Sequence, residues 1–392
     1  MPTGQDLTPE QLHILVQSPE PFSTGTPVPL HLLPLSQPQS LRMSTPVEST
    51  VLSSSSPQTT LLDELEEPKN NTTAMNAADV AHASEFSESP VPSRAPHASD
   101  AAEGKSTGGQ AEEELWKTSG FKIGFAEDKN KKYRRTMEDA HAYFYNFGKS
   151  NGSGWFAIFD GHAGKSAADW CGTHMHENFE TVLHENPTMP VPDLLNKSFL
   201  LTDRQLGERK GSYSGCTAVV GYIRTEERPL TEDGESANGK QTRRRRVLYT
   251  ANAGDARAVL CRDGKAIRLS YDHKGSDPAE AKRIVESGGF VMNNRVNGVL
   301  AVTRSLGDIS MKEWVIGSPY TTETVLDEND GFLILACDGI WDVCSDQTAT
   351  DLIRDVMDPQ QASEDLLDYA LENFSTDNLS VMIVRLDQHY VP

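Results

Sequence analysis

Four short segments of this 392-residue sequence place acidic side chains where strand-like sequence begins or ends. They are Glu138-Asp139, Asp160-Gly161-His162, Asp338-Gly339 and Asp377-Asn378. A buried carboxylate without a partner is costly, so each acid needs an arginine, a backbone amide or a metal ion beside it. One such acid is typical of a turn or a cap, whereas four in one domain favour hard divalent cations. Mg²⁺ and Mn²⁺ prefer oxygen ligands, and the histidines and cysteines lack the spacing of zinc ligands.

The elements that would position these acids are short apolar strands and amphipathic helices. Apolar runs predict strands at 154–159, 217–223, 247–251, 332–337 and 379–385, and helical spacing covers 164–183, 192–206, 347–357 and 362–374. Asp277 as N-cap, Pro278 and the later Gly288 delimit one more short helix. Strands and helices come in blocks, which predicts an α+β fold of packed antiparallel sheets with helices outside.

Composition divides the chain near residue 114. Residues 1–114 are rich in Ser, Thr, Pro, Gln and Ala, and their only aromatic residues are Phe22 and Phe86. Such a segment buries too little apolar surface to offset the entropy of ordering it, so we expect a disordered extension. Its two apolar patches, 12–16 and 60–65, are either docking motifs or transient helices. Residues 115–392 hold all five tryptophans and form the expected single domain.

Charge and cysteine usage limit the partners and the compartment. The net charge of −21 argues against nucleic acid, which requires a basic face. Five scattered cysteines without a CxxC pair indicate buried free thiols in a reducing compartment. With neither a signal-peptide pattern nor an apolar run of about 20 residues, we expect a soluble monomer in the cytoplasm, the nucleus or both, away from membranes.

A polar stretch at 224–246 is expected to be a loop inserted between two strands. It ends in Arg243-Arg244-Arg245-Arg246, which is either a solvated charge run or a signal for nuclear import or an acidic partner. The residues alone leave both interpretations open.

Eight motifs, in order over about residues 115–388, resemble the metal-dependent type 2C (PPM) serine/threonine protein phosphatases. They span 134–141, 159–164, 214–218, 252–257, 271–274, 301–308, 336–342 and 377–381. One motif would be weak, but eight in the family's order are specific, and the likeness is greatest to fungal members that dampen stress-activated MAP-kinase cascades. The chain departs from the family at Gly275, where a proline is common, and in the length of 224–246.

The resemblance implies a four-layer α/β/β/α sandwich with two Mg²⁺ or Mn²⁺ ions in a cleft at one edge. Asp160 would bridge both ions. The Gly161 carbonyl would bind one of them, and Glu138 would lie on that side through water. Asp338 and Asp377 would hold the other ion. The pair of ions would activate a bridging water and offset charge on the phosphoryl oxygens.

Further roles follow from the same resemblance. Asp139 would orient metal-bound water, and Asp255 and Asp342 would bind a third, weaker ion. Arg134 would clamp the phosphate with its guanidinium fork, although the adjacent Arg135 is an alternative.

His162 would protonate the departing seryl or threonyl oxygen. The alternative is that His162 is a structural residue of a turn. The expected activity is hydrolysis of phosphoserine and phosphothreonine in proteins. MAP kinases are candidate substrates.

Three rival functions would require different residues in the sequence. A catalytically inactive scaffold or sensor of this fold would lack some of the acids, and all are present here. A cysteine-dependent phosphatase needs a thiolate in a phosphate-cradling loop, and no cysteine has that context. A metal-dependent nuclease is disfavoured by the net acidity.

Overall fold

The computed structural model describes residues 115–209, 211, 213–229 and 242–390. The expected disordered extension at 1–114, with its two apolar patches, lies outside these residues. Within the described part of the chain, no helix has the length and apolar character needed to cross a membrane.

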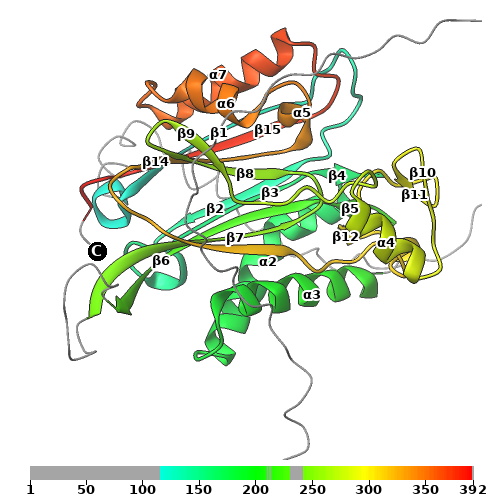
Figure 1. Cartoon of the computed structure of the whole chain (residues 1–392), viewed down its shortest axis with the longest axis horizontal. Helices are drawn as coiled ribbons and strands as arrows, with labels where there is room; N and C mark the ends of the chain where they lie inside the picture. The colour runs from blue at the N-terminus through cyan, green and yellow to red at the C-terminus, as the bar shows by residue number, and fades with distance from the viewer. Residues whose placement is uncertain (1–114, 210, 212, 230–241, 391–392) are drawn as a thin grey trace, which may run out of the picture. The chain divides into compact units, whose positions relative to one another are not determined.

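Two five-stranded antiparallel sheets form the centre of the fold (Figure 1). The first has the order β13-β7-β6-β3-β2 and the second has the order β1-β15-β14-β8-β9. Their bounds are β13 Tyr320–Val325, β7 Thr242–Ala253, β6 Ala218–Pro229, β3 Gly154–Phe159 and β2 Ala140–Tyr145, then β1 Phe121–Asp128, β15 Leu379–Leu386, β14 Asp330–Ala336, β8 Arg257–Arg262 and β9 Lys265–Arg268.

Helices cover the outer face of each sheet (Figure 1). The first sheet packs against α2 (Ser166–Glu185) and α3 (Val191–Glu208), and the second against α6 (Asp346–Ile353) and α7 (Pro359–Glu372). The short α5 (Asp338–Trp341) follows β14 directly. A third apolar core lies between the sheets, where side chains such as Phe156 and Leu333 are fully buried. The predicted sandwich of two antiparallel sheets between helices is confirmed.

Small elements lie at one end of the sandwich (Figure 1). A three-stranded sheet has the order β12-β5-β4, and a helix and a hairpin lie near it. The bounds are β4 Gly161–His162, β5 Gly215–Cys216, β12 Leu306–Gly307, α4 Pro278–Glu286, β10 Val291–Met292 and β11 Arg295–Val296, with 3-10 turns η3 Phe147–Lys149 and η4 Ile309–Met311. Asp277 caps α4 as predicted, because its side chain accepts hydrogen bonds from two backbone amides of the first turn.

The predicted loop at 224–246 is wrong in part. Strand β6 continues to Pro229 and β7 begins at Thr242, so the arginine run belongs to a strand and only residues 230–241 lie outside the described part of the chain. Opposite charges pair across the two strands, with Glu226 facing Arg245 and Glu227 facing Arg244. Such cross-strand pairs stabilise a polar hairpin that has no apolar alternation to reveal it.

The prediction that the cysteines are free and buried is confirmed. All five cysteines, Cys171, Cys216, Cys261, Cys337 and Cys344, are free and buried. Burial raises the pKa of the Cys344 thiol to about 11, so this thiol stays protonated near neutral pH.

Candidate active site

The acid-bearing segments meet at one end of the second sheet because its strands are antiparallel. Ala336, at the end of β14, pairs with Arg257 at the start of β8 and with Val381 near the start of β15. Asp338 therefore lies just beyond this end of the sheet, beside Asp255, which precedes β8, and Asp377, which precedes β15.

These acids line one cavity of about 530 Å³. Its lining includes eight of the predicted site residues: Arg134, Asp160, Gly161, His162, Asp255, Asp338, Asp342 and Asp377. Asp160 comes from the other sheet, directly after β3. The structure therefore brings together side chains that are more than 200 residues apart along the chain.

Two glycines allow the segments to approach this closely. A Cβ atom on Gly161 would lie 2.1 Å from the backbone oxygen of Glu138, and one on Gly339 would lie 2.2 Å from that of Asn378. Real Cβ atoms do not tolerate such contacts with backbone. Glycine at these positions therefore lets the loop after β3 touch the segment before β2, and lets α5 touch the start of β15.

Burial and mutual repulsion raise the pKa of the cavity carboxylates. For Asp160 the shift is large and comes first from burial, then from Asp139 and Asp338. For Asp338 it comes first from burial, then from Asp255 and Asp342. The carboxylates therefore repel one another in a poorly solvated interior. Positive charge placed among them would reduce this repulsion.

The protein supplies part of that positive charge itself. Arg134 Nη2 lies 2.5 Å from Asp377 Oδ2, and Lys274 Nζ lies 3.3 Å from Asp255 Oδ2 and 3.5 Å from Asp342 Oδ1. Within the described residues, no group of three or more Asp, Glu, His or Cys side chains is close enough together to bind a metal ion as the side chains now lie. The acids line the cavity walls instead, and among the described residues no ion pair involves Asp160 or Asp338. An oxygen-rich, negatively charged donor set of this kind fits a hard divalent cation.

Arg134 and His162 both reach the cavity. Arg134 lines it, and its Nε also donates to the carbonyl of Thr376, whereas Arg135 is exposed and lies outside the lining. His162 Nε2 lies 2.7 Å from Asp308 Oδ2. Sequence reasoning gave no role to Asp308 or Lys274, although both lie inside recognised motifs, because nothing in their spacing predicts these contacts.

Comparison with known proteins shows the family to which the chain belongs. The family model described as Protein phosphatase 2C matches residues 123–379. The chain belongs to the protein phosphatase 2C family. It is 49% identical over 266 residues to Protein phosphatase 2C homolog 1 of Saccharomyces cerevisiae, covering 68% of this chain and 94% of that one. It is 45% identical over 275 residues to the protein of the same name in Schizosaccharomyces pombe, covering 70% and 75%.

Solved structures resemble the fold as well. A Caenorhabditis elegans sex-determining protein is 28% identical, with a TM-score of 0.58 over 68% of this chain and 65% of that one. A Toxoplasma gondii phosphatase has a TM-score of 0.57 at 24% identity, over 70% and 95% of the two chains. As a protein phosphatase 2C, the chain is a serine/threonine phosphatase of a metal-dependent hydrolase family that generally uses Mg²⁺ or Mn²⁺.

Two predicted acids of this phosphatase, Glu138 and Asp139, are not among the residues that line the cavity. Glu138 accepts hydrogen bonds from Thr136 Oγ1 at 2.8 Å and from the Gly164 amide at 3.0 Å. Asp139 is buried and accepts a hydrogen bond from Ser380 Oγ at 2.8 Å. Burial raises the pKa of Asp139 to about 6 although this hydrogen bond opposes the shift.

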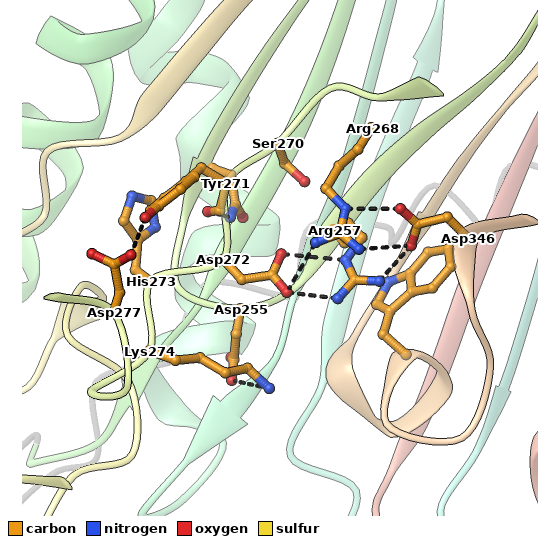
Figure 2. Close-up of polar contacts among 12 residues, drawn as sticks. Asp255, Arg257, Arg268, Ser270, Tyr271, Asp272, His273, Lys274, Asp277 and Asp346 are labelled. Carbon is orange, nitrogen blue, oxygen red and sulfur yellow. Dashed lines mark hydrogen bonds and ion pairs between the residues drawn. The ribbon is translucent and has the colours of Figure 1, made fainter. Parts of the chain in front are cut away.

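Behind the cavity, a charged network joins three segments of the phosphatase fold. Figure 2 shows Arg257 between Asp272 and Asp346, with Arg268 bonded to the same Asp346. Asp272 lies two residues before Lys274, and Asp346 is the first residue of α6. The Arg257 guanidinium also lies 5.0 Å from the ring centre of Trp341 in α5. One side chain therefore links β8, the segment carrying Lys274, and the helices that follow Asp338.

Proposed function

We propose that this phosphatase removes phosphate from phosphoserine and phosphothreonine in proteins with the help of Mg²⁺ or Mn²⁺ held in the acidic cavity. The observation that carries the proposal is the convergence of buried, mutually repelling carboxylates on one 530 Å³ cavity that also contains an arginine and a histidine. Residues 115–392 form the catalytic domain in this proposal.

The ion-binding roles are those that the family resemblance implies. Asp160 would hold two ions together with the Gly161 carbonyl and Glu138 for one ion and with Asp338 and Asp377 for the other. When bound, the ions would lower the pKa of water and offset charge on the phosphoryl group.

Other acids would support this centre. Asp139, buried behind Asp160, would orient water. Asp255 and Asp342, which share Lys274, would take a third, weaker ion.

The chain's other side chains would bind the phosphate and supply a proton. Arg134 would exchange its pairing with Asp377 for a bidentate contact with the phosphate, because its fork matches two phosphate oxygens. Its side chain is 48% exposed, so this movement does not require the core to open. His162 would give a proton to the departing alkoxide, a poor leaving group.

For the substrates, we propose phosphoproteins of stress-activated MAP-kinase cascades. The support is the motif resemblance to fungal members together with the two yeast relatives. The expected setting is a monomer in the cytoplasm or nucleus. An inactive scaffold is the alternative, and it is disfavoured because every predicted acid is present around the site.

The replacement of Asp160 by Asn tests the proposal. We expect Asp160→Asn to fold normally by circular dichroism and to release no phosphate from a phosphothreonine peptide with Mg²⁺ or Mn²⁺, and excess chelator should silence the wild type. Asp169→Asn is the matched control, because Asp169 is a half-exposed acid on α2 paired with Lys165. Full activity of Asp160→Asn, or of the wild type in chelator, would refute the proposal.

A further inference from the structure

A buried carboxylate holds the histidine of the cavity. Asp308 Oδ2 lies 2.7 Å from Nε2 of His162, and the Asp308 side chain is 8% exposed, against 25% for His162. His162 lines the cavity, whereas Asp308 does not. The contact therefore joins a ring that faces the cavity to an acid fixed inside the protein.

The three-stranded sheet brings these two side chains together. Gly215 of β5 pairs with His162 of β4 on one side and with Gly307 of β12 on the other, and Asp308 follows Gly307. A Cβ atom on Gly215 would lie 2.1 Å from Asp308 Oδ2 and 2.5 Å from His162 Nε2. The contact can therefore form only because residue 215 has no side chain.

The backbone at Asp308 is itself unusual. Its φ is +47°, in the left-handed region that residues other than glycine seldom adopt. A conformation of this kind persists when the surrounding contacts fix it, and it is frequent at functional sites.

The hydrogen bonds fix how the ring is held. Asp308 Oδ2 accepts a hydrogen bond from Ser305 Oγ and also lies against Nε2 of His162. When both ring nitrogens carry a proton, both are donors, so Nε2 would donate to Asp308 and Nδ1 would carry the second proton. Among the described residues, no hydrogen bond engages Nδ1 of this ring, which leaves that nitrogen for a ligand in the cavity.

We propose that Asp308 is a positioning residue that orients His162 for proton donation from Nδ1. The inference rests on the donor role of His162 in the proposed function. As a water oxygen bonds to phosphorus and the bond to the seryl or threonyl oxygen breaks, the proton on Nδ1 passes to that oxygen. The proton released by the water then restores the ring, while the second proton stays on Nε2, hydrogen-bonded to Asp308.

The test compares leaving groups. Asp308→Asn should lower kcat about 10–100-fold on a phosphothreonine peptide, with KM nearly unchanged, because alkoxide departure needs the proton. The loss should shrink for phenyl phosphate and fall below about 3-fold for p-nitrophenyl phosphate, whose leaving group is a stable anion. A merely structural change would lower all three rates alike, and that result would overturn the proposal.

Two further variants guard against a misfolded protein. Gly215→Ala places a methyl group between the two side chains and should give the same dependence on the leaving group. Asp203→Asn is the matched control: Asp203 Oδ1 accepts from the Gly307 amide at 2.9 Å and pairs with Lys312 at 2.8 Å, next to Asp308. Whatever this control does to the rate, it should do equally to every substrate.

A double-mutant cycle separates this inference from the proposed function. In a His162→Ala background, Asp308→Asn should have no further effect, and an additive loss would overturn the positioning role alone. If His162→Ala shows no dependence on the leaving group, the donor role fails and the inference fails with it.

Discussion

Replacing Arg257 with Ala should strongly destabilise the phosphatase domain. Its guanidinium bonds to Asp272 Oδ2 at 2.6 Å and to Asp346 Oδ1 at 2.5 Å, and its side chain is only 11% exposed (Figure 2). Alanine would leave two poorly solvated carboxylates with fewer partners and would remove the stacking on Trp341.

The loss of stability depends on the ion pairs that Asp272 and Asp346 keep in Arg257→Ala. Breaking a buried ion pair by removing one partner costs about 3–5 kcal/mol. Arg268 stays bonded to Asp346 at 2.8 Å and lies 3.6 Å from Asp272, so the lower end of that range applies. In a domain of this size, about 3 kcal/mol lowers Tm by roughly 6–12 °C. The Tm of Arg257→Lys should lie between those of the wild type and Arg257→Ala, because an ammonium group keeps the charge but cannot bond to both acids as a guanidinium fork does.

Thermal unfolding followed by circular dichroism measures these differences. The matched control is Arg354→Ala, because Arg354 is 53% exposed and its pair with Asp351 spans 3.8 Å. Exposed pairs of this kind contribute about 0–1 kcal/mol. If Arg257→Ala lowers Tm no more than the control does, the network is not a source of stability and the reasoning is wrong.

Two other predictions concern acid stability and the approach of two ligand segments. Burial, helped by the positive charge of Arg304, lowers the pKa of His273 to about 4 from its ordinary 6.5, so the unfolded chain binds the proton more readily. The contribution of His273 to stability in urea should therefore fall by up to about 3 kcal/mol as pH drops from 6.5 to 4, while the buried acids of raised pKa contribute in the opposite direction. His273→Gln should weaken that pH dependence, and an unchanged slope would contradict it. Gly339→Ala would press on the Asn378 carbonyl and separate Asp338 from Asp377, so half-maximal activity should need at least about tenfold more Mg²⁺. An unaltered Mg²⁺ titration would show that the segments do not need this close approach.

Much of the fold and of the cavity lining could be predicted from the sequence because both depend on local patterns. The apolar run before Asp338 fixes β14, and the run after Asp377 fixes β15. Once two such strands pair antiparallel, the end of one lies beside the start of the other, so acids at these boundaries meet. The outer half of the β6–β7 hairpin was missed because it is polar on both strands, and its pairing depends on charges that face each other only after folding.

The partners of the acids depend on tertiary structure, and no periodicity encodes them. Lys274 reaches Asp255 and Asp342 only because the segment after β9 folds back across the end of the sheet, where the His273 amide donates to the Gly254 carbonyl at 2.9 Å. Asp308 reaches His162 across a glycine that belongs to a third strand. In both cases the sequence shows that an acid or a base is present. Its partner depends on the path of a loop, and packing in other parts of the domain determines that path. For that reason, the acids at strand ends and the motifs that resemble the family could predict which side chains face the cavity, but not which cations and acids hold them there.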